Sequence, residues 1–211
     1  MTAATTILVM AKAPVPGRVK TRLCPPFTPD QAAGLALAAL LDTLDTVLAA
    51  PAAERVLVLE GTPGPWIPDG ITVRPQHGEG LDERIANALT EVRGPIVLIG
   101  MDTPQLTVRQ LTVDWRRHDA WFGRAADGGF WALGLRVPDP DLVRGVPMSR
   151  NDTGARQLRR LTAAGLRVGH LVELRDVDTV DDARQVAIEC EGSRFSTCLT
   201  AHLQTLEHSG V

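Results

Sequence analysis

Four basic side chains stand close together near the start of the chain, in a segment that holds no acidic residue before Asp30. The four are Lys12, Arg18, Lys20 and Arg22. An arginine offers a phosphate a planar pair of donors and a lysine offers a compact positive charge, while Gly17 lets the backbone come close to an anion. The segment therefore predicts a phosphate-binding loop, with an ordinary solvated loop as the alternative.

The spacing of this segment excludes two familiar nucleotide motifs. Lys20-Thr21 imitates the end of a Walker A loop, but the glycines that precede such an end are missing. A GxGxxG sequence, which marks a Rossmann dinucleotide site, is missing here as well. A phosphate site at this loop would thus belong to another nucleotide-binding arrangement.

A single aspartate follows the clearest buried strand in the sequence. Asp102 comes directly after the apolar run 97–100, and Pro104 biases Thr103 toward an extended backbone. A carboxylate at the carboxyl end of a strand can bind Mg²⁺ or Mn²⁺, hard ions that prefer oxygen ligands and bridge to phosphates. We favour this metal site over the alternative, in which Asp102 caps the segment that begins at Leu106.

A second pair of carboxylates follows the apolar run 168–174. Asp176 and Asp178 would repel each other unless a cation lay between them. Asp178 with Thr179 equally has the form of a cap for a helix that begins near Val180. Metal binding and helix capping both stay open for Asp178.

Further carboxylates mark a possible second side of the site. Asp127, Gly128 and Gly129 precede a strand and predict a tight turn with exposed backbone amides. Asp127 could orient or deprotonate an acceptor hydroxyl, although simple turn chemistry would explain it too. Asp152 is a second candidate on the acceptor side, but the position favours a helix N-cap.

Short apolar runs alternate with helical patterns along the whole chain. The expected strands are 6–10, 55–60, 71–74, 95–100, a strand around Trp121, 130–137 and 167–171. The expected helices are 28–50, 81–92, 108–118, 153–164 and 180–190. The first helix opens with a capping box at Thr28 and Gln31 and carries a leucine stripe. The stripe is formed by Leu37, Leu40, Leu41, Leu44 and Leu48.

This alternation predicts a mostly parallel sheet covered by helices on both faces, a three-layer α/β/α domain. Ligands of such sheets bind outside the carboxyl ends of the strands. We therefore expect the loops after Met10, after Gly100, around Asp127 and after Leu174 to converge on one site.

The amino-acid composition indicates the general class of protein. Of the 211 residues, 44% are hydrophobic and 22% charged, which is typical of one globular domain over 1–211. The net charge of −3 gives no general attraction for nucleic acid. The three cysteines have no metal-ligand spacing, and neither a signal peptide nor a membrane-spanning run is evident, so we expect reduced thiols and a cytoplasmic location.

Five motifs in matching order make the chain resemble the bacterial DUF2064 family, which is called glycosyltransferase-like and has the GT-A nucleotide-diphospho-sugar transferase fold. The motifs are MAKAPVPGRVKTRL at 10–23, GLDER at 80–84, IGMDTPQL at 99–106, DGGFWALGL at 127–135 and DVDTVDD at 176–182. The resemblance spans 6–187 and leaves 191–211 as a helical extension, for packing or for a homodimer contact. The family usually has proline and tyrosine where Arg124 and Phe130 stand.

The resemblance implies a transferase, related to molybdenum-cofactor and phospholactate guanylyltransferases. It makes Asp102 the metal-binding aspartate, gives Asp178 a contact to the same Mg²⁺ or Mn²⁺, and puts the turn 127–129 on the acceptor side. Lys20, Asp102 and Asp127 would be the catalytic residues, with Lys12, Gly17, Arg18 and Arg22 at the phosphates.

Three functions follow from these residues. The first is glycosyl transfer from a nucleotide-sugar to a small acceptor, with Asp127 or Asp152 as base. The second is nucleotidyl transfer from a free NTP with release of pyrophosphate, which needs no dedicated base. The third is a non-catalytic nucleotide-binding module, against which the presence of Asp102 counts.

Overall fold

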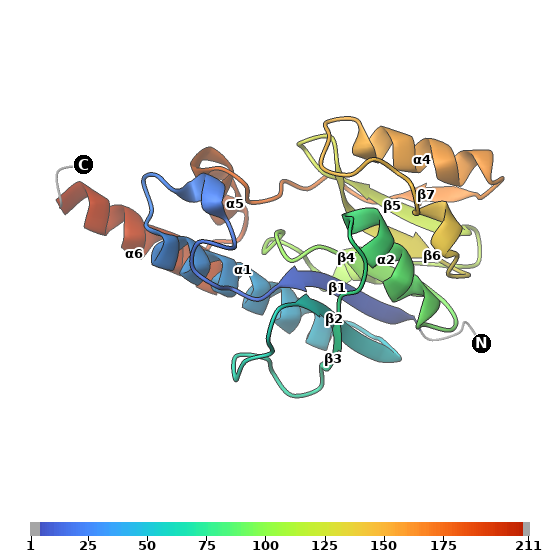
Figure 1. The fold of residues 1–211 in the computed structure, drawn as a ribbon, viewed down its shortest axis with the longest axis horizontal. Coiled ribbons are helices and arrows are strands. Elements are labelled where there is room, and N and C mark those ends of the chain that lie inside the picture. Colours follow the sequence, from blue (N-terminus) through green and yellow to red (C-terminus); the bar gives the residue numbers. More distant parts are fainter. Residues whose placement is uncertain (1–4, 209–211) are drawn as a thin grey trace.

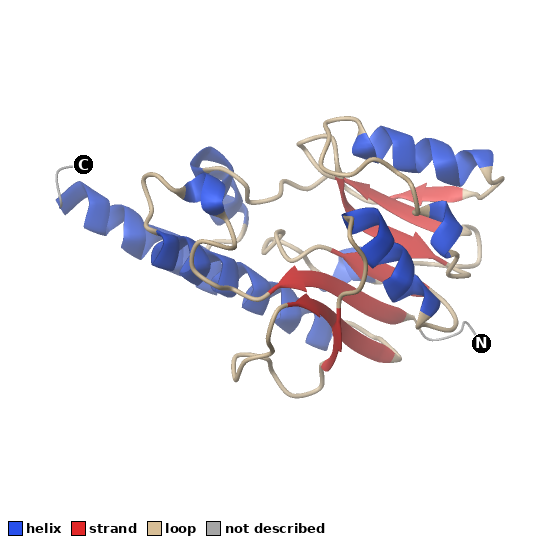
Figure 2. Ribbon diagram, in the orientation of Figure 1, coloured by secondary structure: helices blue, strands red, loops and turns tan. Residues whose placement is uncertain are grey.

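The computed structural model describes residues 5–208 and shows a single twisted sheet flanked by helices (Figures 1 and 2). The strands are β1 (Thr6–Lys12), β2 (Glu54–Glu60), β3 (Thr72–Pro75), β4 (Ile96–Ile99), β5 (Ala120–Arg124), β6 (Phe130–Leu135) and β7 (Val168–His170). The helices are α1 (Pro29–Ala49), α2 (Leu81–Thr90), α3 (Val108–Leu111), α4 (Thr153–Ala163), α5 (Val180–Glu189) and α6 (Arg194–His208). Two short 3₁₀ turns, η1 (Thr21–Leu23) and η2 (Pro140–Leu142), complete the elements.

The sheet has the strand order β3-β2-β1-β4-β6-β5-β7 and is mostly parallel, which confirms the expected fold class. Only β6 runs against its neighbours β4 and β5. The reversal matters for the site. Because β5 runs parallel to the central strands and β6 returns, the turn between them, residues 125–129, lies at the edge where β1 and β4 end.

Helices cover both faces of the sheet, as expected (Figure 1). Alternate residues of β1 enter opposite clusters, with Ile7 and Val9 packed toward α1 and Leu8 and Met10 toward α2. Successive side chains of a strand point to opposite faces, so a strand buried on both faces is apolar at every position. The central strands therefore form the rigid base from which the functional loops emerge.

Helix α1 corrects the expectation of one leucine stripe. Leu37, Leu41 and Leu48 are only partly buried. Two faces of the helix are buried instead. Ala33, Ala36, Leu40 and Leu44 face the sheet, and Ala32, Leu35 and Ala39 face α5 and α6. Small alanines on both faces let α1 lie between two layers, which a search for large side chains at helical spacing overlooks.

Helix α1 is also long and apolar enough to cross a membrane by length and composition alone. Its most apolar window has a mean hydropathy of 1.6, and 56% of that window is buried inside the protein. A core helix meets the same criterion, and α1 packs as one, against the sheet and against α6.

The helix expected over 108–118 is wrong beyond its first turn. Helix α3 ends at Leu111, because Thr112 leaves the helical conformation with φ −93° and ψ 88°. Two β-branched residues, Thr112 and Val113, disfavour further helix at this point. Trp115 then enters the core, where its indole nitrogen donates a hydrogen bond of 2.9 Å to Thr5.

The expected C-terminal extension is helix α6, which packs on α1 and α5; residues 209–211 lie outside the described residues. Asp42 on α1 joins the two helices. Its carboxylate accepts hydrogen bonds from the backbone amides of Arg194 at 3.2 Å and Phe195 at 2.8 Å. The side chain is only 10% exposed, so Asp42 caps the start of α6 from a neighbouring helix.

Asp42→Ala is therefore expected to lower the free energy of unfolding by about 1–2 kcal/mol, the usual effect of losing a helix cap. Urea denaturation would measure it. Asp45→Ala is the matched control, because Asp45 is 53% exposed and contacts only the guanidinium of Arg194. Equal, small effects of both substitutions would contradict the capping role of Asp42.

Candidate functional site

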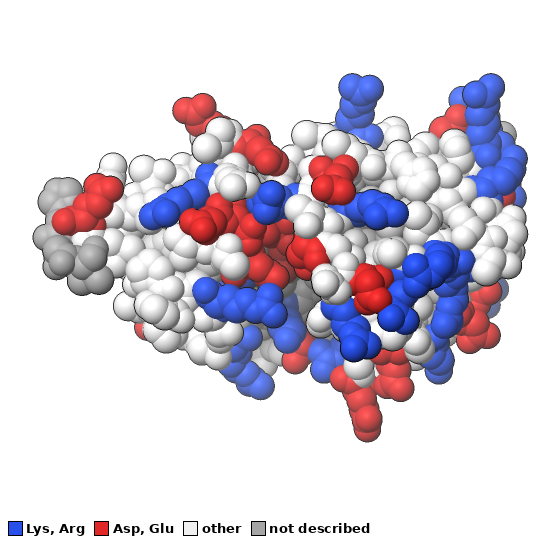
Figure 3. Space-filling model, turned by 90° about the horizontal axis from the view of Figure 1, so that it is seen from above, with Lys and Arg blue, Asp and Glu red and all other residues white. Residues whose placement is uncertain are grey.

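A cleft of about 640 Å³ opens at the carboxyl ends of β1 and β4. The four loops expected to converge all contribute to it, and Figure 3 shows acidic side chains gathered beside a hollow in this face, with basic side chains around them. The basic lining residues are Lys12, Arg18, Lys20, Arg22, Arg84 and Arg150, and the acidic ones are Glu79, Asp102, Asp127, Asp176 and Asp178. Opposite charges from distant segments thus share one cavity.

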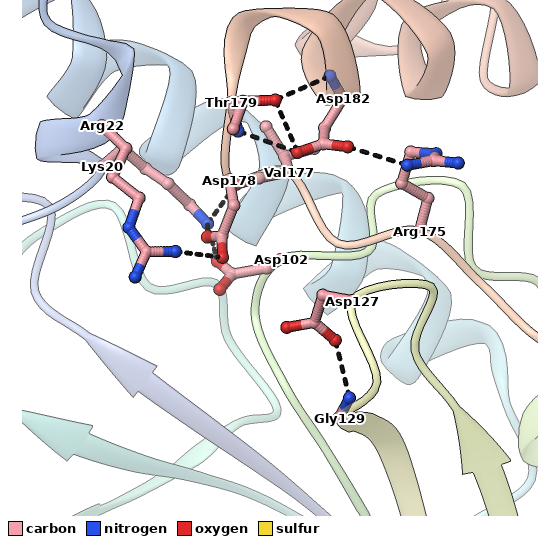
Figure 4. Close-up of polar contacts among 10 residues, drawn as sticks. All are labelled: Lys20, Arg22, Asp102, Asp127, Gly129, Arg175, Val177, Asp178, Thr179 and Asp182. Carbon is pink, nitrogen blue, oxygen red and sulfur yellow. Dashed lines mark hydrogen bonds and ion pairs between the residues drawn. The ribbon is translucent and has the colours of Figure 1, made fainter. Parts of the chain in front are cut away.

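Lys20 forms the centre of the cleft (Figure 4). Its Nζ lies 2.9 Å from Oδ1 of Asp102 and 3.3 Å from Oδ1 of Asp178. The same ammonium donates a short hydrogen bond to the backbone oxygen of Val177. The Lys20 side chain is 8% exposed, so this charge is almost fully enclosed by its acceptors. The basic loop and Asp102 therefore face each other directly.

The surroundings of Lys20 keep it charged. Burial by itself would lower the pKa of Lys20, but the negative charges of Asp102 and Asp178 outweigh burial and raise the pKa above its ordinary value. The amine is an ammonium throughout the neutral pH range. It neutralises two carboxylates that would otherwise repel each other.

The backbone at Lys20 is strained. Its φ of 48° lies in the left-handed region, which residues with a side chain rarely adopt. Among residues 5–208 the one other non-glycine residue with positive φ is Ser149, at 58°, and it lines the same cleft. Such strain persists only where surrounding contacts enforce it, and it is concentrated at functional sites.

The carboxylate of Asp178 pairs with basic side chains of the cleft and does not cap helix α5. Arg22 Nη1 donates to its Oδ2 at 3.2 Å while Lys20 holds its Oδ1. Helix α5 is capped by the next residue, Thr179, whose side chain accepts from the amide of Asp182, and the carboxylate of Asp182 accepts from Thr179 in return. Helix capping is therefore the task of Thr179, and the carboxylate of Asp178 lines the cleft.

Asp102 is likewise not a helix cap. The cap of α3 is Thr107, in a capping box with Gln110. The backbone oxygen of Asp102 accepts a 3.0 Å hydrogen bond from the amide of Val177, which fixes the two carboxylate-bearing segments side by side. Oδ1 of Asp102 is buried, and its partner is the ammonium of Lys20, 2.9 Å away.

Asp176 is a lining residue to which the sequence analysis gave no role. Burial, followed by the charges of Asp102 and Asp127, raises its pKa to about 8. The sequence analysis missed the signal for this position, which is that successive side chains of an extended segment point in opposite directions. Val177 is buried in the core, so Asp176 and Asp178 on either side of it point the other way, toward the cleft.

Asp127 faces the same cleft from the turn between β5 and β6 (Figure 4). Its Oδ1 accepts a 2.8 Å hydrogen bond from the amide of Gly129, so the expected turn chemistry is present. Gly128 has φ 90°, and a Cβ there would lie 1.9 Å from the backbone oxygen of Asn151. Close contact with the loop before α4 thus orients the turn.

The same contact involves Gly154 in the first turn of α4. A Cβ at Gly154 would lie 2.2 Å from the backbone oxygen of Gly129. Gly154→Ala is expected to lower the free energy of unfolding by about 1–3 kcal/mol, since backbone on both sides must shift. Thermal unfolding would measure this. Ala155→Gly in the same turn removes a methyl group without such a clash, and a larger effect there would contradict the close-packing argument.

Three further residues predicted for the site lie at its margin or outside it. Asp152 does not line the cleft; its carboxylate pairs with Arg156 at 2.7 Å and makes no capping hydrogen bond. Gly17 has φ 74° and shapes the basic loop without lining the cavity. Lys12 lines the cleft and pairs with Glu60 at 3.5 Å.

A polar network also lines the cleft, where β1 and β2 end. Gln76 donates through Nε2 to the backbone oxygens of Ala11 and Val58, at 2.8 and 2.9 Å. Arg84 of α2 pairs with Glu60 at 2.5 Å, beside Lys12. The sequence analysis singled out neither residue for the site, and the partners of Gln76 are backbone atoms distant in sequence.

The residues fit a divalent cation that is shared with phosphates. Among residues 5–208 no three His, Cys, Asp or Glu side chains gather as a protein-only metal cage. Mg²⁺, however, is commonly held by one or two carboxylates together with substrate oxygens. Asp102 and Asp178 lie on either side of one cationic nitrogen, and their carboxylate oxygens have lone pairs beyond those that face Lys20.

A second hollow of about 710 Å³ lies between α5 and α6. It is lined mainly by apolar and small polar side chains, with Arg184 and Glu191 as its charged residues. The charged cleft at the strand ends therefore remains the candidate site.

Comparison with known proteins identifies the family of the chain. Residues 35–150, just over half of the chain, match the family described as "uncharacterized protein conserved in bacteria (DUF2064)". No curated protein matches the chain.

Several solved structures share the fold. A candidate nucleotide-diphospho-sugar transferase from Desulfovibrio desulfuricans G20 has a TM-score of 0.83 at 27% identity, over 99% of this chain and 96% of that one. Rv0371c from Mycobacterium tuberculosis H37Rv has a TM-score of 0.54 at 24% identity, covering 88% and 98%. The 2-C-methyl-D-erythritol 4-phosphate cytidylyltransferase of Thermus thermophilus has 0.51 at 16%, covering 90% and 99%.

The similarity to Rv0371c and to the cytidylyltransferase shows the fold alone. The similarity to the Desulfovibrio desulfuricans protein extends over nearly the full length of both chains. The expected family and fold are confirmed. The protein belongs to the DUF2064 family and has the nucleotide-diphospho-sugar transferase fold.

Proposed function

We propose that the protein is a transferase that binds the phosphates of a nucleotide-activated donor, together with Mg²⁺ or Mn²⁺, in the charged cleft. One observation carries the proposal. A cationic loop and a pair of strand-end aspartates meet at Lys20, whose Nζ is 2.9 Å from Asp102 and 3.3 Å from Asp178. Phosphates bind to positive charges such as those of the loop, and a divalent cation binds to carboxylates such as those of the two aspartates.

Each part of the cleft has a role in this proposal. Arg18, Lys20 and Arg22 bind phosphate oxygens, with Lys12 at the edge. Asp102 and Asp178 hold the divalent cation, which would stabilise negative charge on the departing phosphate. Arg18 is exposed and forms no ion pair in the described part of the chain, so its guanidinium is available to an anion.

We further propose that the transferred group is a glycosyl unit. Asp127 lines the cleft from the turn between β5 and β6, away from Lys20 and Arg22 (Figure 4), and one of its oxygens remains after the other has bound Gly129. A carboxylate so placed can remove a proton from an acceptor hydroxyl. The candidate transferase from Desulfovibrio desulfuricans, which is similar over nearly the full length, supports this choice.

Nucleotidyl transfer from a free NTP is the competing function. Six basic side chains line the cleft, more than a sugar diphosphate requires, and positioning with charge neutralisation is enough for phosphoryl chemistry. The cytidylyltransferase neighbour shares the fold. The two functions differ in the product that leaves, and this makes them separable.

A thermal-shift panel of NTPs and nucleotide-sugars, each with Mg²⁺ and with Mn²⁺, tests the proposal. A ligand at about 100 times its dissociation constant stabilises a protein by about 2.7 kcal/mol, so a true donor stands out. We expect a nucleotide-sugar to shift the unfolding temperature most, and only with metal. A preference for an NTP, with release of pyrophosphate, would establish the competing function instead.

A further inference from the structure

Lys20 places its ammonium where a divalent cation would bridge Asp102 and Asp178. The nitrogen is within 3.3 Å of both carboxylates and also binds the oxygen of Val177. Its side chain is 8% exposed, against 74% for the neighbouring Arg22. The Lys20 side chain is therefore not exposed to solvent and free to bind a phosphate. It is engaged as the counter-ion of both proposed metal-binding carboxylates (Figure 4).

The basic composition of the chain supports a special role for lysine here. The chain has 22 basic residues other than histidine, and only Lys12 and Lys20 are lysines. Both line the cleft. An ammonium is a compact point charge with three donors, whereas a guanidinium is a broad planar fork. Three acceptors around one nitrogen, as at Lys20, suit an ammonium.

Neither ligand can bind alone without a penalty. A free divalent cation must displace the ammonium from both carboxylates and leave it enclosed beside the new charge. A free phosphate that draws Lys20 away leaves Asp102 without its counter-ion and Asp178 with only the exposed Arg22, both close to the anion. When cation and phosphate arrive together, the cation compensates the carboxylates and Lys20 compensates the phosphate. All charges are then paired.

We infer that Lys20 acts as a stand-in cation, which excludes free divalent metal and makes the metal-complexed phosphate the ligand of the cleft. This rests on the proposed function, since it assumes that phosphate and metal share the site. It also implies that metal and phosphate each raise the affinity for the other, because binding coupling is reciprocal.

Mn²⁺ alone, without nucleotide, gives the decisive test. Free Mn²⁺ is followed by electron paramagnetic resonance during titration of the wild type, Lys20→Met and Arg22→Met. We expect Lys20→Met to bind Mn²⁺ about tenfold more tightly than the wild type, within the usual range of such couplings. Arg22→Met removes an exposed charge 3.2 Å from Asp178 and should change the affinity about threefold or less, as expected of a solvent-screened pair.

Two further measurements distinguish a change in metal binding from misfolding of a variant. Circular dichroism checks each variant, and Lys20→Gln serves as a second neutral replacement of similar length. Mn²⁺ without nucleotide should raise the unfolding temperature of both Lys20 variants more than that of the wild type. If the Lys20 variants bind Mn²⁺ no more tightly than Arg22→Met, the inference is wrong.

The outcome separates this inference from the proposed function. If the wild type shows metal-dependent stabilisation by a donor while the Lys20 variants bind Mn²⁺ like the wild type, only the stand-in role fails. If no donor stabilises the wild type, the proposed function fails, and the inference about metal-complexed phosphate fails with it. Tighter Mn²⁺ binding by the Lys20 variants would then show only that the ammonium competes with the cation.

Discussion

Asp102→Ala is expected to abolish metal-dependent donor binding while the fold stays intact. The wild type at about 100 times the dissociation constant of its donor should gain about 5–10 °C in unfolding temperature, and the variant should lose this gain. The reason is that Asp102 emerges directly after β4 into the cleft and is the carboxylate nearer to Lys20, at 2.9 Å against 3.3 Å for Asp178. The fold should remain, since the contact to Val177 uses the backbone oxygen of Asp102.

The matched control for this experiment is Asp181→Ala on helix α5. Asp181 is also an aspartate, but it is 86% exposed, and its one ion pair within residues 5–208 is with Arg184, at 3.7 Å. Its removal changes the net charge equally and should leave the donor-dependent shift unchanged. Full metal-stimulated stabilisation of Asp102→Ala would rule out the metal assignment, and an equal loss in both variants would attribute the effect to net charge.

The sequence predicted the parts of the molecule that local pattern determines. Asp102 was placed at a strand end because the apolar run before it can only be a buried strand, and the structure has β4 over Ile96–Ile99. The capping box at Thr28 and Gln31 is present as expected, because both of its hydrogen bonds lie within one turn. Features that depend on a few neighbouring residues can be derived from the sequence.

Features that depend on distant partners could not be derived in this way. Lys20 and Asp178 are 158 positions apart, and nothing local shows that this lysine would be enclosed by carboxylates instead of extending toward solvent. The raised pKa of Asp176 comes from burial and from Asp102 and Asp127, which three separate segments bring together. Asp152 failed as a lining residue for a local reason. Its direction is set by Arg156 and by the packing of α4, not by its position before a helix.

Asp127→Asn is expected to reduce turnover about 10²- to 10⁴-fold, the usual contribution of a general base, while the affinity for the donor stays the same. The substitution is chosen because an asparagine oxygen can still accept the hydrogen bond from Gly129, so the turn is kept and only the proton acceptor is lost. Initial rates with the donor identified in the panel and a series of small hydroxyl-bearing acceptors would measure turnover, and the thermal shift with donor and metal would measure binding.

Asp152→Asn is the control for Asp127, since Asp152 pairs with Arg156 and does not line the cleft. It should keep turnover within about threefold of the wild type, as expected for a surface ion pair. If Asp127→Asn also keeps that rate, Asp127 is no base. Chemistry without a dedicated base, as in nucleotidyl transfer, would then be the better account of the cleft. A loss confined to Asp127 favours glycosyl transfer, because the acceptor hydroxyl must lose its proton as the new bond to the sugar forms.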